Sequence, residues 1–268
     1  MKLAVTGRTQ APEQAPLVLR GPYEQMIPAA ARLGYDAMEL HIHDSAQLDR
    51  AGLKRLFEDN GITLASIGTG SAYVEDHIHL ASDDEAVRRR AVRRIQEHMD
   101  TAAEYDAVVI LGLIKGMIRD CPSRESCIGR LTASLEELVR KAEADRVPLV
   151  FEVLNRYESD FLNTIDETLE FVAPFASEYL LLHIDTYHMN IEEADVGAAI
   201  RRGGGKIGHC HIADSDRWYA GHGHFDFGET IRALKDIGYS RALSVESFMF
   251  PDSLTSASES LKTLKKYV

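Results

Sequence analysis

The sequence predicts a (β/α)8 TIM barrel formed as a single domain, residues 1–268. Three observations support this fold class. The chain contains eight short apolar runs typical of buried strands, and segments with helical periodicity separate them. The repeat of about 25 to 40 residues per strand and helix suits parallel βαβ connections. With 268 residues, 45% of them hydrophobic, the chain is large enough for one barrel core.

The predicted strands follow one another at regular intervals along the chain. They are residues 2–7, 37–42, 63–69, 107–113, 148–154, 180–187, 206–213 and 242–248. Turn signals such as NGIT, DRVP and IGYS precede several of them. An open doubly wound sheet is the structural alternative, and it commonly carries a glycine-rich phosphate loop after its first strand. GTGSAY (68–73) lacks the third glycine, and the glycines at 203–205 precede a strand, so neither forms such a loop.

The amino-acid composition disfavours several classes of binding partner and of protein. The formal net charge of −12 disfavours nucleic acid and anionic membranes as partners. RRRAVRR (88–94) is the strongest local exception, and we interpret it as the solvated face of a helix. The three cysteines form no CxxC pair, which disfavours a disulfide scaffold. No signal peptide or membrane span is predicted, so we expect a cytoplasmic protein.

Four ionisable residues stand late in four consecutive predicted strands, at spacings of 33, 26 and 35 residues. They are Glu152, Asp185, His211 and Glu246. The carboxyl ends of barrel strands form the mouth of the barrel, so these side chains can converge there. Three carboxylates and one imidazole suit Mn²⁺, Mg²⁺ or Co²⁺. A bound cation would also explain why Glu152 occupies an apolar strand, since a buried carboxylate costs several kcal/mol unless it is paired or ligates a metal.

Each of these residues also has a simpler structural role open to it. Glu152 could pair with Arg156 or a lysine, and Asp185 could cap the next helix. His211 could be a hydrogen-bonded core histidine, and Glu246 could join an internal salt bridge. The agreement of the four positions favours a shared metal site over four separate roles.

Strand alternation places further polar residues on the inner faces. His183 and His209 stand two residues before two of the candidate ligands, one layer deeper in the barrel. They could hydrogen-bond to the metal ligands or simply pack. Glu39 and His41 share one strand face and are also expected to point inward, with partners that the sequence does not identify.

Three longer motifs carry a resemblance to a known family. They are EVLNRYE (152–158), DTYHMNIEE (185–193) and HIADSDR (211–217). With Glu246 in SVES, they make the chain similar to the ketose 3-epimerases of the xylose isomerase-like TIM barrel superfamily, of which D-tagatose 3-epimerase is the type. The resemblance covers the whole chain. Within the family, SIGTGSAY (66–73) and HIADSDRWYAGHGHFDF (211–227) are most similar to the 5-keto-L-gluconate epimerases.

The resemblance implies site residues and a cofactor. The implied metal ligands are Glu152, Asp185, His211 and Glu246, holding one divalent ion per chain, with Mn²⁺ as first choice and Co²⁺ or Mg²⁺ as alternatives. The implied substrate contacts are Glu158, His188 and Arg217. One departure is Val153, where many relatives have proline. His222 and His224 in the GHGH loop either border the substrate or lie in a surface loop.

The activity that follows is inversion of C3 of a free ketose or keto-sugar acid through an enediolate. Glu152 would act as base on one face of the substrate and Glu246 as proton donor on the other, with the roles exchanged for the reverse epimer. Aldose–ketose or hydroxypyruvate-type isomerisation starts with the same proton removal and stays open. An endonuclease for abasic DNA and a non-catalytic sugar-binding barrel are disfavoured, the first by the acidic charge and the second by the paired glutamates. We expect a homodimer or homotetramer.

Overall fold

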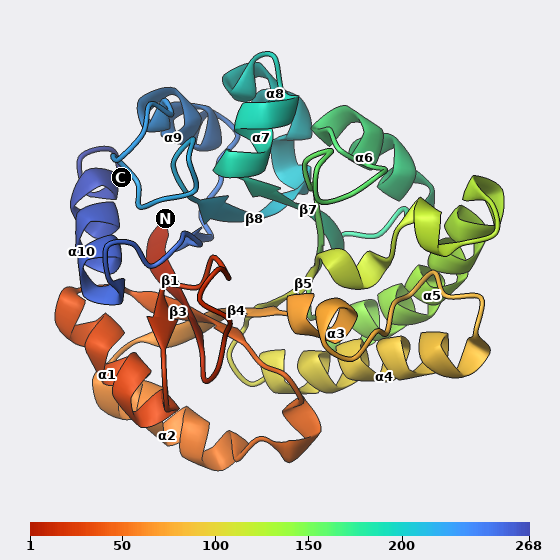
Figure 1. The fold of residues 1–268 in the computed structure, drawn as a ribbon, viewed down its shortest axis with the longest axis horizontal. Coiled ribbons are helices and arrows are strands. Elements are labelled where there is room, and N and C mark those ends of the chain that lie inside the picture. The colour runs from red at the N-terminus through yellow and green to blue at the C-terminus, as the bar shows by residue number, and fades with distance from the viewer.

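In the computed structural model, which describes residues 1–268, eight parallel strands close into a barrel surrounded by helices (Figure 1). The barrel strands are β1 (Lys2–Arg8), β3 (Ala37–His41), β4 (Thr63–Gly68), β5 (Val108–Leu111), β6 (Leu149–Glu152), β7 (Leu180–Asp185), β8 (Ile207–Ile212) and β9 (Ala242–Val245). Pairing of β1 with both β3 and β9 closes the ring. The predicted fold class is confirmed, and each of the eight predicted runs forms a strand. The two-residue strand β2 (Leu19–Arg20), which pairs with β1, was not predicted.

The helices lie outside the barrel and follow the strands in sequence. The α-helices are α1 (Tyr23–Leu33), α2 (Arg50–Asn60), α3 (Gly70–Val74), α4 (Glu85–Ala102), α5 (Arg124–Asp145), α6 (Ile165–Val172), α7 (Thr186–Glu192), α8 (Val196–Gly203), α9 (Phe227–Asp236) and α10 (Ser253–Leu264). Short 3₁₀ turns occupy Ser45–Gln47, Leu113–Lys115, Ile118–Asp120, Ala173–Phe175 and Gly204–Lys206. No helix in the chain combines the length and the apolar composition needed to cross a membrane.

Side-chain caps define where several helices begin. Asp84 accepts hydrogen bonds from the backbone N–H groups of Ala86 and Val87 and so starts α4. The arginine-rich stretch lies on this helix, where Arg89, Arg90 and Arg93 are exposed to solvent, as expected of a solvated face. The buried face of the helix packs into the main core.

The core has two parts, which the pleat of the strands separates. A cluster of 62 buried residues fills the space between barrel and helices. Inside the barrel, the small side chains of Ala4, Ala37 and Ala242 pack together at one end. From the same strand faces, the next inward-pointing positions toward the carboxyl ends are polar, beginning with Glu39, two residues after Ala37. The barrel therefore changes from an apolar floor to a polar mouth.

Candidate functional site

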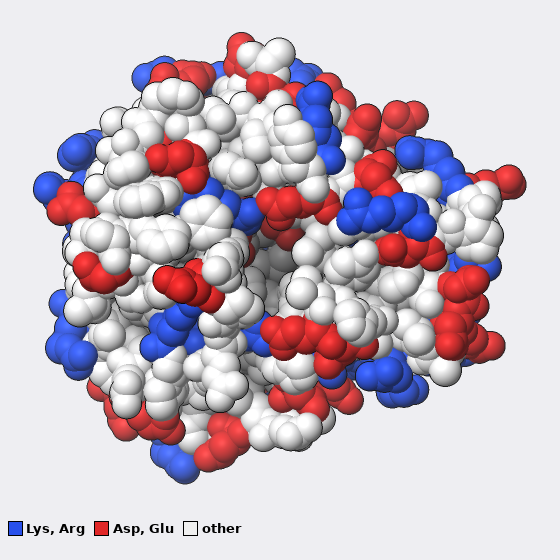
Figure 2. Space-filling model, in the orientation of Figure 1, with Lys and Arg blue, Asp and Glu red and all other residues white.

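The four predicted metal ligands lie together at the carboxyl ends of four neighbouring strands. Glu152 and Asp185 end β6 and β7, His211 is the penultimate residue of β8, and Glu246 directly follows β9. The strand register pairs Asp185 with His211, so their side chains leave neighbouring strands at the same level. All four residues are buried, and three of them, Glu152, His211 and Glu246, line a cavity of ≈ 360 Å³. Figure 2 shows this face of the molecule hollowed near its centre, with acidic and basic side chains around the opening.

The side-chain donors of these residues point toward one another. Glu152, Asp185 and His211 each offer one ligand atom, and these atoms all lie within 4.8 Å of one another. Oε2 of Glu246 lies 3.4 Å from Nδ1 of His211. The structure therefore brings the four predicted residues together, through contacts centred on the imidazole of His211.

The orientation of the His211 ring is set from the side away from the cluster. Its Nε2 lies 2.8 Å from Oε1 of Glu39, a carboxylate with no exposed surface. Its Nδ1 is buried, has no hydrogen-bond partner, and lies 3.8 Å from Oδ2 of Asp185. That carboxylate oxygen is also buried without a partner. Buried polar atoms are normally hydrogen-bonded, so two unpartnered ligand atoms that face each other indicate a binding position for a cation.

Three of the four simpler roles are present beside the cluster, since His211 hydrogen-bonds to Glu39, Glu246 pairs with Arg217 and Asp185 caps a helix. Arg156 pairs with Glu192, so it leaves Glu152 without an arginine partner. Asp185 does cap α7, because its Oδ1 accepts a hydrogen bond of 2.7 Å from the backbone N–H of Tyr187. The cap uses only one of the two oxygens of Asp185, which leaves the other for the cluster.

The cluster contains more carboxyl groups than the neighbouring positive charges can neutralise, and this shifts their pKa values. Burial and the nearby Glu246 carboxylate raise the pKa of Glu152 to about 8. Burial raises the pKa of Asp185 to about 6, although the positive charge of Arg217 opposes this shift. Burial also acts to raise the pKa of Glu246, but His211 and Arg217 outweigh it and lower this pKa to about 2. Glu152 is thus the carboxyl group that most lacks a counter-charge.

A divalent cation fits this arrangement of residues. The donor set is three carboxylates and one imidazole nitrogen, which suits ions of the Mn²⁺, Mg²⁺ and Co²⁺ type. The Nε2 contact of His211 with Glu39 is the contact that a metal-ligating histidine commonly makes through its second nitrogen. A cation would supply the positive charge that Glu152 lacks and would occupy the unpartnered Nδ1 and Oδ2 atoms.

Glu39 is the centre of a hydrogen-bond network that the sequence did not reveal. Its carboxylate lies 2.9 Å from Nε2 of His41 and 2.8 Å from Nε2 of His209, and it accepts a 2.6 Å hydrogen bond from Ser66. Burial alone would raise the pKa of Glu39, but the His211 charge and the histidine hydrogen bonds lower it well below its usual range. Glu39 is therefore an ionised buried group whose contacts hold the histidines in place.

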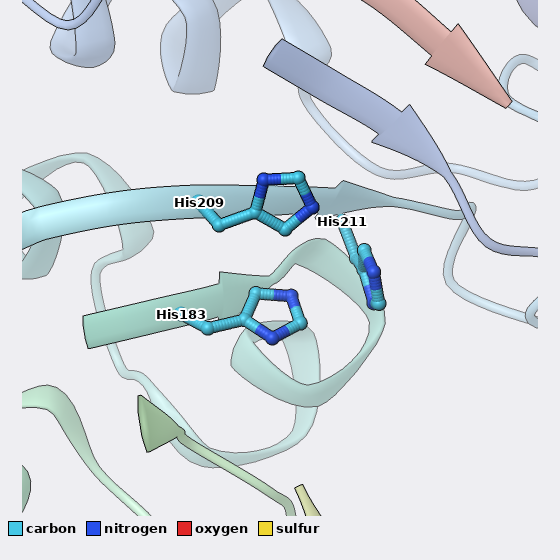
Figure 3. A group of neighbouring side chains, drawn as sticks. All are labelled: His183, His209 and His211. Atoms are coloured by element: carbon cyan, nitrogen blue, oxygen red, sulfur yellow. The ribbon is translucent and has the colours of Figure 1, made fainter. Parts of the chain in front are cut away.

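The predicted layer of histidines below the cluster is present. Figure 3 shows His183 and His209 side by side on neighbouring strands, with the ring of His211 close to both. The ring centroids of His183 and His211 are 4.0 Å apart, with the rings nearly perpendicular. Both ring nitrogens of His183 lack hydrogen-bond partners. Burial lowers the pKa of His183 well below its usual range, so the ring is neutral and packs beneath the cluster.

Two neighbours of Glu152, Gly112 and Lys115, lie just beyond β5 and were not predicted as site residues. A Cβ atom built on Gly112 would overlap Oε2 of Glu152, so only glycine lets the β5 end approach this closely. Lys115 is fully buried, and its Nζ donates a hydrogen bond of 3.2 Å to the backbone carbonyl of Glu152. On the other side, the N–H of Val153 donates to the carbonyl of His183 at 3.0 Å, a bond that a proline at this position could not make.

The three residues expected to contact substrate lie beside the cluster. Nη1 of Arg217 lies 2.6 Å from Oε1 of Glu158, and its Nη2 lies 3.0 Å from Oε2 of Glu246. The guanidinium also packs over the ring of Tyr187, 4.8 Å from its centroid. Glu158 and Arg217 line the cavity. His188 lies behind them, with Nδ1 2.7 Å from Asn155 and with Nε2 unpartnered, 4.0 Å from Oε1 of Glu152.

Much of the remaining wall of the cavity comes from the amino-terminal part of the chain, and Ile110, Leu113 and Leu154 complete it. The amino-terminal part includes Arg8, residues 14–17, His41 and Glu75. His222 and His224 are exposed and do not line the cavity, which favours the surface-loop alternative for both. The ring of His222 stacks on Trp218, with centroids 4.4 Å apart.

Comparison with known proteins agrees with this architecture. The family model described as "Xylose isomerase-like TIM barrel" matches residues 27–267. The L-ribulose 3-epimerase of Mesorhizobium japonicum is 36% identical over 229 residues, covering 84% of this chain and 75% of that protein. The D-psicose 3-epimerase of Agrobacterium fabrum is 31% identical over 236 residues, covering 85% of this chain and 79% of that protein.

Solved structures give the same result for the fold. The crystal structure of D-allulose 3-epimerase from Methylomonas sp. in complex with D-allulose superposes with a TM-score of 0.82 at 26% identity and covers 100% of both chains. An AP endonuclease of family 2 from Brucella melitensis superposes with a TM-score of 0.78 at 15% identity, which reflects a shared fold alone.

Proposed function

This chain belongs to the ketose 3-epimerase family of xylose isomerase-like TIM barrels and is an isomerase-class enzyme, and we propose that it inverts C3 of a free ketose or keto-sugar acid. The proposed acid/base pair is Glu152 and Glu246, and the proposed metal ligands are these two residues with Asp185 and His211. The single observation that carries the proposal is that two buried carboxyl groups, one at the end of β6 and one directly after β9, line the same cavity as His211.

Inversion at a carbon next to a carbonyl requires proton removal on one face and proton delivery on the other. A divalent cation held by the four ligands would polarise the substrate carbonyl and so make the C3 proton more acidic. Glu152 takes the proton from one epimer, and Glu246 delivers a proton from the opposite side. For the reverse reaction the two glutamates exchange roles, which is why both must reach C3.

The neighbouring residues orient the pair and the substrate. Arg217 contacts both Glu246 and Glu158, so it restrains one member of the pair and reaches the cavity beside it. Its guanidinium can donate to the carbonyl and hydroxyl oxygens at the C1 and C2 end of the sugar, and the Glu158 carboxylate can accept a hydrogen bond from a hydroxyl group. His188 stands behind Glu152, where its unpartnered Nε2 can hydrogen-bond to a carboxylate or to substrate.

The test is a panel of ketoses and keto-sugar acids incubated with the Mn²⁺-loaded enzyme in deuterated buffer. Proton NMR should show deuterium entering at C3 together with the appearance of the C3 epimer. Formation of an aldose with deuterium at C2, together with recovered ketose deuterated at C1, would instead indicate aldose–ketose isomerisation. Removal of metal with EDTA should abolish turnover, and Mn²⁺ or Co²⁺ should restore it. Full activity after exhaustive chelation would contradict the metal site.

A further inference from the structure

A second cavity opens at the amino-terminal end of the barrel, at the opposite end from the metal cluster. This basal cavity has a volume of ≈ 420 Å³ and is bordered by residues at or near the starts of β1, β4, β5, β8 and β9. None of its lining residues lines the cavity at the mouth, so the two are separate sites. The residues that matter below are Lys2, Ala65, Asp106, His209, Arg241 and Ala242.

Small side chains leave the room for the basal cavity. Ala4, Ala37 and Ala242 pack together inside the amino-terminal end of the barrel, and Ala65 packs against them. Barrel interiors are normally filled by layers of bulkier, branched side chains. With methyl groups at these positions the layer does not close completely, and Ala65 is only half-buried. The cavity therefore reaches inward as far as the ring of His209.

The strand register places His209 and Lys2 on either side of one of these alanines. Lys2 of β1 pairs with Ala242 of β9. Cys210 of β8 pairs with Leu243 of β9, so His209, one residue earlier, stands beside Ala242. His209, Ala242 and Lys2 all line the basal cavity. Neighbouring strands are about 4.8 Å apart, so the imidazole and the ammonium group border a notch roughly 10 Å wide with a methyl group at its base.

His209 offers one free ring nitrogen to the basal cavity, although the residue is only 1% exposed. Its Nε2 lies 2.8 Å from Oε2 of Glu39, an ionised carboxylate that holds the ring proton on this nitrogen. Its Nδ1 makes no hydrogen bond within the protein and is not sealed from solvent. Burial lowers the pKa of His209, so the ring is neutral and Nδ1 is an acceptor. A hydroxyl group that enters the cavity can donate to it.

Two unpaired cations stand at the opening of the basal cavity. Lys2 and Arg241 are exposed, and neither side chain makes an ion pair or a hydrogen bond with another residue. They are neighbours, since the backbone N–H of Lys2 donates to the carbonyl of Arg241 at 3.3 Å. Asp106 borders the opening from the residues before β5 and pairs with neither of them. Two adjacent cations without a counter-charge, in a chain of net charge −12, favour an anion at this opening.

We propose that the basal cavity is a second ligand site, which binds the phosphate ester of a small polyol. The phosphate contacts Lys2 and Arg241, whose two positive charges match its own charge. A hydroxyl group of the same ligand donates to Nδ1 of His209, and Asp106 can accept from another hydroxyl. This site uses no residue of the metal cluster, so the inference does not depend on the proposed epimerase function.

A phosphate ester uses both ends of the basal cavity. Inorganic phosphate would pair with the two cations, but it is too short to reach His209 across the notch as well. A neutral polyol would leave Lys2 and Arg241 without a counter-charge. The ester supplies the anion at the opening and the hydroxyl donor inside.

The binding test is calorimetry of the metal-loaded protein with sn-glycerol 3-phosphate, inorganic phosphate and glycerol. Glycerol 3-phosphate should bind about tenfold more tightly than inorganic phosphate, and glycerol should not bind. The double variant Lys2→Gln/Arg241→Gln should weaken the binding of glycerol 3-phosphate on the order of 10- to 100-fold. Both substitutions are at exposed positions, so the fold and the Mn²⁺ affinity should not change.

The matched control is Lys54→Gln/Arg90→Gln, which removes the same charges from exposed positions on α2 and α4, outside the basal cavity. It should leave the binding of glycerol 3-phosphate unchanged. An equal loss in both double variants would indicate general attraction of anions and overturn the inference. Equal affinity for inorganic phosphate and the ester, or no binding of either, would also overturn it.

NMR of protein labelled with ¹⁵N-histidine tests the contact inside the basal cavity. The Mg²⁺-loaded protein is used, because paramagnetic Mn²⁺ would broaden the signals, and His209→Gln identifies the signals of His209 by their loss. Glycerol 3-phosphate should shift the Nδ1 signal of His209, and inorganic phosphate should not. An Nδ1 signal that glycerol 3-phosphate leaves unmoved would show that the ligand stays on the surface, and the proposed site would be wrong.

Discussion

His211 and Glu39 lie 2.8 Å apart, Nε2 to Oε1, although they are far apart in the sequence. This contact turns Nδ1 of His211 toward Asp185 and Glu246. Glu39→Gln keeps the size of the side chain but removes the negative charge that fixes the imidazole orientation. We expect Mn²⁺ affinity to fall by about 10- to 100-fold. Calorimetric titration of the metal-free protein measures this directly, and an unchanged affinity would show that His211 is oriented by other contacts.

Neutralising one of the two glutamates should leave one half-reaction, catalysed by the other glutamate, intact. Glu246→Gln keeps a ligating oxygen but cannot carry the proton. Glu152 should then still exchange the C3 hydrogen of one epimer with deuterated solvent, without inversion, while the other epimer shows neither exchange nor product.

Glu152→Gln should give the mirror pattern, and metal content must be measured in both variants. Interconversion at the native rate by both metal-loaded variants would rule out a two-carboxylate mechanism.

Gly112 lets β5 approach the carboxylate of Glu152. Gly112→Ala should push that carboxylate aside, because the new Cβ would overlap Oε2. The end of a glutamate side chain can move, so we expect a folded protein with reduced metal affinity and turnover. Gly129→Ala in α5 is the control, since its Cβ meets no atom within 4 Å. Native activity in both variants would show that Glu152 tolerates the displacement.

Stability of the metal-free protein should depend on Glu152 in a defined pH direction. Burial raises its pKa from 4.5 to about 8. Between these values the folded state keeps a proton that the unfolded state releases, so the free energy of unfolding decreases as pH rises. Glu152→Gln lacks this proton and should lose less stability from pH 5 to pH 8.

Urea unfolding at several pH values in EDTA, for the native protein and the variant, measures the difference. Mn²⁺ should reduce the loss in the native protein, because a bound cation favours the ionised carboxylate. Parallel pH profiles for the two metal-free proteins would show that Glu152 ionises normally.

Arg20 organises the amino-terminal loop over the cavity. Its guanidinium donates to the backbone carbonyls of Ala11, Pro12, Glu13, Ala15 and Leu17. Residues 14–17 of this loop line the cavity. Arg20→Gln should release the loop and raise KM by roughly 3- to 10-fold with little change in kcat.

Arg89→Gln is the control for Arg20→Gln, because Arg89 is exposed on α4 and makes only surface ion pairs. Steady-state kinetics of the two variants measures the change in KM that each substitution causes. An equal KM for both would show that the loop keeps its shape without Arg20.

The sequence by itself determined the barrel and the rim on which Glu152, Asp185, His211 and Glu246 stand. Parallel strands repeat at a nearly constant interval, and their carboxyl ends share one edge, so position within a strand is enough to predict proximity. Alternation along each strand likewise placed His183 and His209 one layer below.

Only the tertiary structure determined the contacts that depend on strand register and on the path of the loops. The partners of Glu39, the close approach of Gly112 and the cavity position of Arg8 join residues from distant parts of the chain. Their distances follow from the closure of the barrel and the packing of its loops, which no local pattern encodes. For the same reason His222 and His224, close to His211 in the sequence, lie outside the cavity that His211 lines.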